Sequence, residues 1–247
     1  MPLSLRISTG QFLKKIGITI SGINRKEDAF KFKGLYSSWE EAKNMCLTYQ
    51  DEDILRNVLT SALQVKAGKA KFERDSVLFY KSEYSWPLLA ILLKASLEND
   101  GYLNIIDFGG SLGSSYFQYR SFLSPIKNLR WNIIEQDHYV KCGKKYFENK
   151  ELRFFTDISE CFSCTRTDIL IASGVMQYLP DPYLEISKII KLGFKYIIFD
   201  RTSFIEKKND RITIQYTSPK IYKASYPIWF FNYKKFLGYF KKDYEII

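Results

Sequence analysis

Apolar and polar positions alternate in blocks between about residues 103 and 200. The runs IIDF, DILIAS and YIIFD are almost wholly apolar, as is typical of parallel strands that are covered on both faces. Between such runs, apolar residues recur at helical spacing. The pattern predicts strands at 103–108, 130–135, 152–155, 168–173 and 195–200, and helices at 113–123, 137–147 and 181–191.

This alternation predicts the fold class. Strands that alternate with helices form a doubly wound, mostly parallel sheet, so we expect an α/β fold of the Rossmann-like kind. Local signals at the helix ends agree with the pattern. Asp137 and Asp181 are suitable N-caps, Pro182 suits the first helical position, and Gly193 suits the residue after a helix.

The N-terminal part of the chain has a different character. Residues 1–36 show no clear periodicity, which indicates loops, and Ser38 can cap a helix that begins with WEEAKNMC. Further helices are predicted over 52–66 and from Ser85, and the latter is apolar almost all round, so we expect it to be buried. We therefore predict a mostly helical N-terminal cover over 1–84 and a ligand-binding domain over 85–247.

After Asp200 the alternation ends. The remaining elements are a strand at 211–216, a helix near 232–240 and a final strand within DYEII. If DYEII is the sixth strand, two arrangements are open: the strand at 211–216 lies beside it, or the sheet lacks the seventh strand usual in this fold.

Composition narrows the class of protein. A chain of 247 residues with 46% hydrophobic residues can bury a core, and it contains no apolar run of 18 residues, so we expect no transmembrane segment and a cytoplasmic protein. Of the net charge of +10, +7 falls in residues 191–247, which contain 12 Lys and Arg and 5 Asp and Glu. No compact basic run occurs, so nucleic acid is not an expected partner. The excess suggests an anionic small-molecule acceptor or an ordinary solvated surface.

The four cysteines do not indicate a metal site. Cys161 and Cys164 have C-x-x-C spacing, but a zinc site needs further ligands and the sequence has a single histidine, His138. The pair also precedes a predicted strand, whereas a thioredoxin-like motif follows one. We expect free thiols and no metal.

The stretch IIDFGGSLGSSYF is the strongest candidate for ligand binding. In a parallel sheet, ligands bind beyond the carboxyl ends of the strands, and here Asp107 ends a strand before a glycine turn. A dinucleotide fingerprint would have glycines at the positions of Ser111 and Ser114. A P-loop would require a lysine, and the turn has none.

An acid followed by glycines at +2, +4 and +6 resembles the turn of class I S-adenosylmethionine-dependent methyltransferases, from which D-x-G-x-S-x-G departs only at Ser111. Together with YSWPLLAILL, WNIIEQ, ASGVMQYLPDP, IIFDRT and ASYPIWFF, about residues 35–240 are similar to a little-characterised family of bacterial methyltransferases often associated with surface-polysaccharide biosynthesis. The resemblance implies S-adenosyl-L-methionine as the cofactor. The family's acceptor does not follow from it.

The resemblance also implies roles for particular residues. Glu135 would bind both hydroxyls of the ribose, Asp157 the adenine amino group, and the SG pair after the fourth strand the methionine end. Asp107 and Asp157 also suit helix N-caps. The residues expected to bind the cofactor are Asp107, Gly109, Gly110, Ser111, Gly113, Glu135, Gln136, Asp157, Ile158, Ser173 and Gly174.

Catalytic and acceptor-binding residues are harder to predict. The candidates for catalysis are Asp200, Arg201 and His138. The alternative for the first two is an internal salt bridge, and in the functional interpretation Arg201 pairs an acidic acceptor. The candidates for acceptor binding are mostly aromatic, and packing against the sheet is their alternative role. They are Gln177, Tyr178, Tyr84, Trp86, Tyr226 and Trp229.

The sequence thus predicts methyl transfer from S-adenosylmethionine to a small or saccharide-linked acceptor in surface glycan biosynthesis. Two alternatives are kept: a catalytically silent adenosine-binding module that acts as a partner protein, and a nicotinamide-dependent oxidoreductase. Ser111 and Ser114 disfavour the oxidoreductase. The acceptor atom, the general base and the oligomeric state are left open.

Overall fold

The computed structural model describes residues 3–7, 31–46, 51–164, 167–217 and 224–246. These residues form two compact units, which are defined by chain contacts. The parallel-sheet unit comprises Asp51–Ser173 and Phe194–Ile198, and the antiparallel-sheet unit comprises Met1–Gln50, Gly174–Gly193 and Phe199–Ile247. This division does not coincide with the expected boundary between residues 84 and 85. The chain leaves the parallel-sheet unit after Ser173 and re-enters it at Phe194, so each unit is built from more than one segment.

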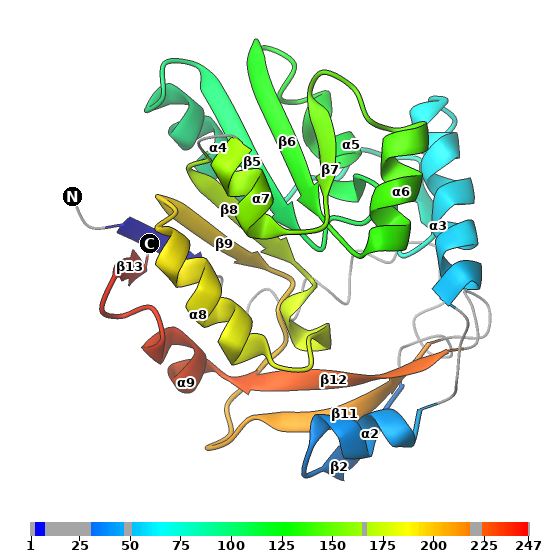
Figure 1. The fold of residues 1–247 in the computed structure, drawn as a ribbon, viewed down its shortest axis with the longest axis vertical. Helices are drawn as coiled ribbons and strands as arrows, with labels where there is room; N and C mark the ends of the chain where they lie inside the picture. The colour runs from blue at the N-terminus through cyan, green and yellow to red at the C-terminus, as the bar shows by residue number, and fades with distance from the viewer. Residues whose placement is uncertain (1–2, 8–30, 47–50, 165–166, 218–223, 247) are drawn as a thin grey trace. The chain divides into compact units, whose positions relative to one another are not determined.

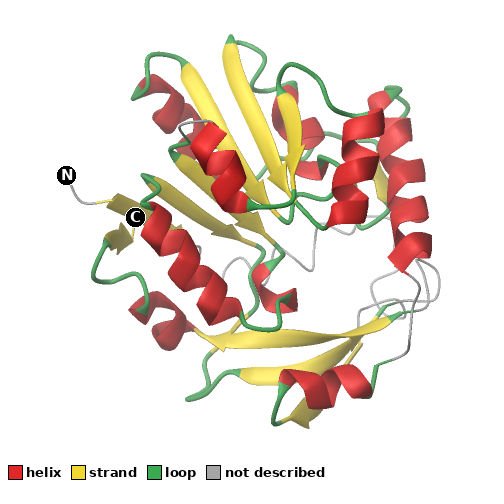
Figure 2. Ribbon diagram, in the orientation of Figure 1, coloured by secondary structure: helices red, strands yellow, loops and turns green. Residues whose placement is uncertain are grey.

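The parallel-sheet unit contains the predicted alternation of strands and helices (Figure 2). Every predicted strand and helix between residues 102 and 173 is confirmed to within three residues. One helix, which carries the C-x-x-C sequence, was not predicted. The elements are α3 (Asp51–Lys66), β3 (Phe72–Arg74), β4 (Val77–Phe79), α4 (Trp86–Leu97), β5 (Tyr102–Phe108), α5 (Ser114–Arg120), β6 (Asn128–Ile134), α6 (Asp137–Tyr146), β7 (Leu152–Phe155), α7 (Ile158–Cys164), β8 (Ile169–Ser173) and the start of β9 (Tyr196–Asp200).

The strands of this unit lie in the order β9-β8-β5-β6-β7 (Figure 1). The neighbours β5 and β6, β5 and β8, and β6 and β7 all pair in parallel. From β5 the chain proceeds to one side through β6 and β7, and then crosses to the other side for β8 and β9. This order confirms the doubly wound α/β fold and places the switch point between β5 and β8.

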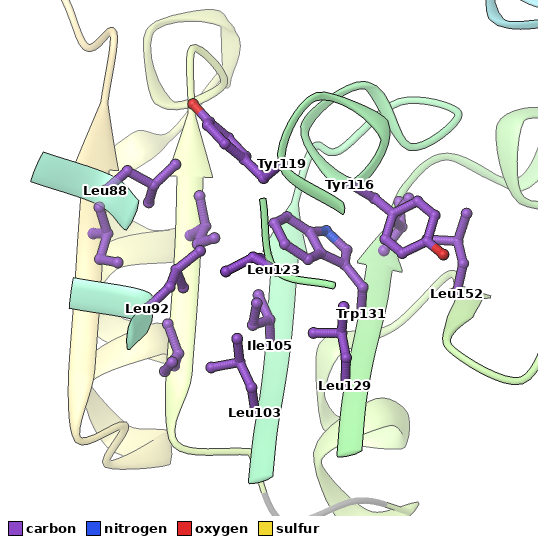
Figure 3. Packing of buried hydrophobic residues seen from close by; sticks show 14 of the residues in the cluster. Leu88, Leu92, Leu103, Ile105, Tyr116, Tyr119, Leu123, Leu129, Trp131 and Leu152 are labelled. Carbon is purple, nitrogen blue, oxygen red and sulfur yellow. The ribbon is translucent and has the colours of Figure 1, made fainter. Parts of the chain in front are cut away.

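The core of the parallel-sheet unit forms where alternate residues of the strands meet the helices. Leu103 and Ile105 of β5 and Trp131 of β6 point to the same side, as the period of a strand requires. Figure 3 shows Leu88 and Leu92 of α4 packed onto this layer. The same cluster includes residues of α3, α5 and α6, so these helices share the sheet face that carries it.

Helix α4 packs into the core, which confirms the expectation that it is buried, and the burial is confined to one face. Leu88, Leu89 and Leu92 are buried, whereas Trp86 and Leu97 are 61% and 83% exposed. The apolar pattern could not show this, because it does not reveal how many neighbours a helix has. No helix in the described residues is long and apolar enough to cross a membrane.

The antiparallel-sheet unit contains a four-stranded sheet in the order β10-β12-β11-β2, of which β12, β11 and β2 are labelled in Figure 1. Helix α2 packs against it, with Ala42, Ile212 and Ile214 in a small buried cluster and Trp39 stacked on Trp229. Its elements are β1 (Leu3–Ile7), β2 (Lys31–Tyr36), α2 (Trp39–Asn44), the 3-10 helix η1 (Met176–Tyr178), α8 (Pro182–Leu192), β10 (Phe204–Ile205), β11 (Arg211–Tyr216), β12 (Ser225–Asn232), α9 (Tyr233–Gly238) and β13 (Tyr244–Ile246).

The described N-terminal residues correct the expectation of loops. Strands β1 and β2 stand where loops were predicted, and residues 8–30 lie outside the described part of the chain. Strand β2 pairs antiparallel with β11, and β1 pairs in parallel with β13. Residues 211–216 therefore lie in the separate sheet, and the described partner of β13 within its unit is β1. Pairing across such distances in sequence depends on tertiary contacts that local patterns do not encode.

The predicted helix ends are largely confirmed. Ser38 and Asp181 each accept a hydrogen bond from the backbone N–H three residues later, and Gly193 ends α8 in the left-handed conformation. Asp137 is instead the first residue of α6, and Gln136 occupies the N-cap position. An acid in the first turn still stabilises a helix, so the signal was correct in kind and displaced by one residue.

Candidate active site

The glycine turn joins β5 to α5 at the switch point of the sheet. Gly109, Ser111 and Gly113 have φ angles of 72°, 55° and 101°, in the left-handed region that glycine adopts readily. Ser111 stands where the methyltransferase pattern has glycine, and its φ explains why glycine is usual there. The turn therefore has the backbone of the pattern even at the position where its residue differs.

The side chain of Asp107 packs against this turn. Its side chain is 1% exposed, and its Oδ2 accepts a hydrogen bond of 2.9 Å from Nε1 of Trp131. A Cβ atom on Gly110 would lie 2.8 Å from the Cγ of Asp107, so the turn has no room for a side chain at that position. Gly113, rather than Asp107, occupies the N-cap position of α5. The alternative of Asp107 as a helix cap is therefore excluded.

Glu135, directly after β6, holds the turn from the side. Its Oε1 accepts a 3.1 Å hydrogen bond from the backbone N–H of Ser111, and its Oε2 accepts a 2.9 Å bond from that of Gln136. Each oxygen keeps a second lone pair for a ligand hydroxyl. Burial raises the pKa of Glu135, although the two N–H groups and His138 act in the opposite direction.

Asp157 and Ile158 mark the start of α7. The Oδ1 of Asp157 accepts a 2.8 Å hydrogen bond from the backbone N–H of Glu160, which is the geometry of a helix cap. The capping alternative is thus confirmed, and an additional contact of Asp157 with adenine stays a prediction. The side chain is exposed, so a ligand can reach its carboxylate.

The ends of β8 and β9 are joined at a second left-handed position. Ser173 ends β8, and the N–H of Gly174, whose φ is 71°, donates a 2.9 Å hydrogen bond to the carbonyl of Asp200. Arg201 also has a positive φ, 52°, and its guanidinium carbon would lie 3.6 Å from a Cβ on Gly174. Its Nε is 3.7 Å from Oδ2 of Asp200, so the internal ion pair that was the alternative is present.

Gln177 and Tyr178 of η1 meet polar groups of the antiparallel-sheet unit. Gln177 is buried, and its Nε2 donates a 3.1 Å hydrogen bond to the carbonyl of Arg201, while its Oε1 is buried without a partner. The hydroxyl of Tyr178 donates a 2.9 Å bond to Oε1 of Gln215, and its ring meets Tyr226 edge to face at 5.5 Å. The structure therefore brings three predicted acceptor residues, Gln177, Tyr178 and Tyr226, into one region.

Trp229 has mainly the packing role that was its alternative. Its Nε1 donates a 3.0 Å hydrogen bond to the carbonyl of Leu179, and its ring stacks on Trp39 and Phe231. An indole that stacks on two rings and is hydrogen-bonded at its N–H contributes chiefly to the rigidity of the sheet.

Tyr84 and Trp86 lie at the far end of α5 from the glycine turn. The hydroxyl of Tyr84 is 3.3 Å from Oγ of Ser121, and both rings pack against Phe122. Because the turn lies at the N-terminal end of α5, the structure does not bring this pair to it. His138 stands in the first turn of α6 beside Tyr139, and in the described residues no three His, Cys, Asp or Glu side chains gather as a metal site would require.

Two side chains that support the turn were not predicted. Trp131 binds Asp107, and Glu73 of β3 accepts a hydrogen bond from the hydroxyl of Ser114. The only sequence signal was Ser114 itself, a departure from the dinucleotide fingerprint. Nothing in the sequence around Glu73 connects it with Ser114, 41 residues later.

Comparison with known proteins gives no family for this chain. No family model matches, and no curated protein matches. Among solved structures, the N-terminal domain of EvdMO1 in the presence of SAH and D-fucose has 11% identity and a TM-score of 0.42, over 78% of this chain and 87% of that one. The same domain with SAH bound has 10% identity and a TM-score of 0.41, over 76% and 86%. Similarities of this size carry no argument about chemistry.

Proposed function

We propose that this protein is an S-adenosylmethionine-dependent methyltransferase. The observation that carries the proposal is the charge around the glycine turn: Asp107 lies beneath it, Glu135 holds its N–H group at Ser111, and Glu73 holds Ser114. Residues 107–114 include no lysine or arginine. The pyrophosphate of a dinucleotide would bring further negative charge to these carboxylates, whereas a sulfonium cofactor is cationic where it reacts.

The residues present fit such a cofactor. Glu135 has lone pairs for the two ribose hydroxyls, and Asp157 is accessible for the adenine amino group. The backbone of Gly109 and Gly110 carries no side chain that would keep a ligand away. When bound, the cofactor supplies an electrophilic methyl group on a sulfonium.

The chain's own contribution to methyl transfer is mainly positioning. An in-line displacement depends on alignment and on the removal of water, and Gln177, Tyr178 and Tyr226 offer polar and aromatic groups that can hold an acceptor. For a hydroxyl acceptor, Asp200 or His138 would take the proton.

The acceptor that we propose is a small or saccharide-linked molecule of surface glycan biosynthesis, and it is anionic. Arg201 offers a guanidinium beside Gly174, and the last 57 residues carry a net charge of +7. A guanidinium pairs with phosphate or carboxylate through two parallel hydrogen bonds.

Calorimetry with S-adenosylmethionine, its demethylated product (SAH) and NAD tests the cofactor. We expect binding of the first two and none of NAD, and selective binding of NAD would overturn the proposal. Transfer of a labelled methyl group to matched phosphorylated and neutral sugars then tests the acceptor. Equal rates on both members of each pair would remove the support for an anionic acceptor, and binding without transfer to any acceptor would indicate a silent cofactor-binding module.

A further inference from the structure

The hairpin of β3 and β4 brings a buried acid to the glycine turn from outside the strand–helix alternation. Glu73 is 3% exposed and lies on β3, which precedes β5 in the chain. The hairpin turns through Asp75 and Ser76, with φ angles of 51° and 68°. Two successive left-handed residues define a turn that usually takes Asn-Gly, so this one must be held in place by other contacts.

Both carboxylate oxygens of Glu73 are used. Oε2 accepts a 3.2 Å hydrogen bond from the backbone N–H of Ser76, and Oε1 accepts a bond from the hydroxyl of Ser114. Ser76 is also tied to α3, because its carbonyl accepts a 2.7 Å bond from the hydroxyl of Ser61. One carboxylate thus connects an anchored hairpin with the first residue of α5.

Ser114 is the residue at which the glycine turn ends. It directly follows Gly113, and the middle of the turn is held at Ser111 by Glu135. Leu112, one of the two residues between Ser111 and Ser114, is fully buried. The turn is therefore fixed at its middle and at its end by carboxylates, one from the sheet and one from the hairpin.

We infer that Glu73 is a positioning residue for the cofactor turn and that it acts through the hydroxyl of Ser114. This inference rests on the proposed function. It explains why serine stands where a dinucleotide-binding turn has glycine: a glycine would remove the hydroxyl that Oε1 of Glu73 accepts, and the loss of a hydrogen bond to a buried carboxylate is costly. Glu73 acts on the backbone of the turn rather than on the cofactor.

A second contact keeps α5 attached to the hairpin region when Glu73 is changed. Nε2 of Gln118 donates a 2.6 Å hydrogen bond to the carbonyl of Glu83, and its Oε1 is 3.5 Å from Arg74. Gln118 lies one helical turn further along α5 and away from the glycine turn. Gln118→Ala is therefore a matched control that loosens the same helix without touching Ser114.

The test measures SAH binding by calorimetry for the wild type, Glu73→Gln, Ser114→Ala, their double variant, Ser114→Thr and Gln118→Ala. Loss of a hydrogen bond to a charged group should weaken binding about tenfold in Glu73→Gln and Ser114→Ala. The double variant should bind SAH no more weakly than the weaker-binding single variant, because the two substitutions remove the same hydrogen bond. Ser114→Thr keeps the hydroxyl and should restore binding, and Gln118→Ala should bind like the wild type.

Each outcome decides the matter. If SAH binds Glu73→Gln and Ser114→Ala as tightly as the wild type, or if Gln118→Ala weakens binding equally, the inference is overturned and the proposed function stands. If the wild type binds no SAH, the proposed function fails and the inference with it. If Glu73→Gln does not fold, Ser114→Ala and Ser114→Thr give the answer alone.

Discussion

The two units of the molecule assemble their candidate sites in different ways. In the parallel-sheet unit, the turn and the acids beside it come mostly from one stretch, residues 107–158, and are held by carboxylates that bind backbone N–H groups. In the antiparallel-sheet unit, the candidate acceptor residues come from two separate segments: Gln177 and Tyr178 lie on η1, and Tyr226 lies on β12. Tyr178 connects the segments through its ring contact with Tyr226 and its hydrogen bond to the neutral amide of Gln215.

This difference shows which part of a site a sequence motif can reveal. A turn between a strand and the next helix is a local feature, so its residues keep a fixed spacing. A region built from distant segments has no such spacing. Changes in the first unit should therefore alter cofactor affinity, and changes in the second should alter the use of the acceptor.

Gly110→Ala should have the largest effect. The new Cβ would lie 2.8 Å from Cγ of the buried Asp107, so we expect a loss of about 2–3 kcal/mol in the free energy of unfolding. SAH binding should weaken roughly a hundredfold. Gly193→Ala is the control in the other unit, where nothing lies within 4 Å, and should cost about 1 kcal/mol without changing SAH affinity. Urea unfolding and calorimetry measure both, and equal losses of affinity would contradict the comparison.

Glu135→Gln should weaken SAH binding about 10- to 100-fold, because a charged acceptor is lost. Since burial raises the pKa of Glu135, the folded state binds a proton at this carboxylate more tightly than the unfolded state does. The wild-type free energy of unfolding should therefore fall as pH rises from the ordinary value of 4.5 through the raised one. The variant should lack this slope in urea titrations that begin near the ordinary value of 4.5 and proceed to higher pH. An unchanged slope would show that Glu135 is not its source.

Tyr178→Phe tests the antiparallel-sheet unit. It removes the donor to the buried Oε1 of Gln215 and should cost about 1–2 kcal/mol of stability. SAH affinity should not change, whereas the KM for the acceptor in methyl transfer should rise. Tyr216→Phe, next to Gln215 on β11 but packed with the α2 cluster, is the control. A loss of SAH affinity in Tyr178→Phe would remove the proposed division between cofactor and acceptor residues.

Glu98→Gln should change stability without changing binding. Hydrogen bonds from Lys195, Lys94 and Tyr196 lower the pKa of Glu98 to about 2. A lowered pKa means that the contribution is present above the ordinary value of 4.5 and is lost as pH falls toward 2. For this partly exposed group we expect about 1 kcal/mol at neutral pH. Unfolding curves of both proteins should converge in acid, and a constant difference would refute the ionic origin.

Ser111→Gly should have the smallest effect. Relief of the left-handed strain, about 1 kcal/mol, is offset by the greater freedom of glycine in the unfolded chain, about 0.5–1 kcal/mol. Ser111 holds Glu135 through its backbone N–H, so SAH affinity should stay within about threefold. A larger loss in calorimetry would show that the serine side chain itself takes part in binding.

Much of the candidate cofactor site was predictable, because its signals are local. The D-x-G-x-S-x-G spacing located the turn, and the acid that ends IIE located Glu135. Trp131 and Glu73 were not predictable, since each meets the turn through a contact between segments that are distant in sequence. The placing of Tyr84 and Trp86 near the ligand depended on proximity in sequence, and the structure puts them at the other end of α5.

The sequence by itself determined the strand–helix alternation, the helix caps and the glycine turn, because periodicity, caps and positive φ angles act over a few residues. Only the tertiary structure decided that β2 joins β11, that β1 joins β13, and that Glu73 reaches Ser114. Strand pairing and the burial of a carboxylate depend on which segments lie side by side. Local sequence patterns do not determine which distant segments pair, whereas tertiary packing does.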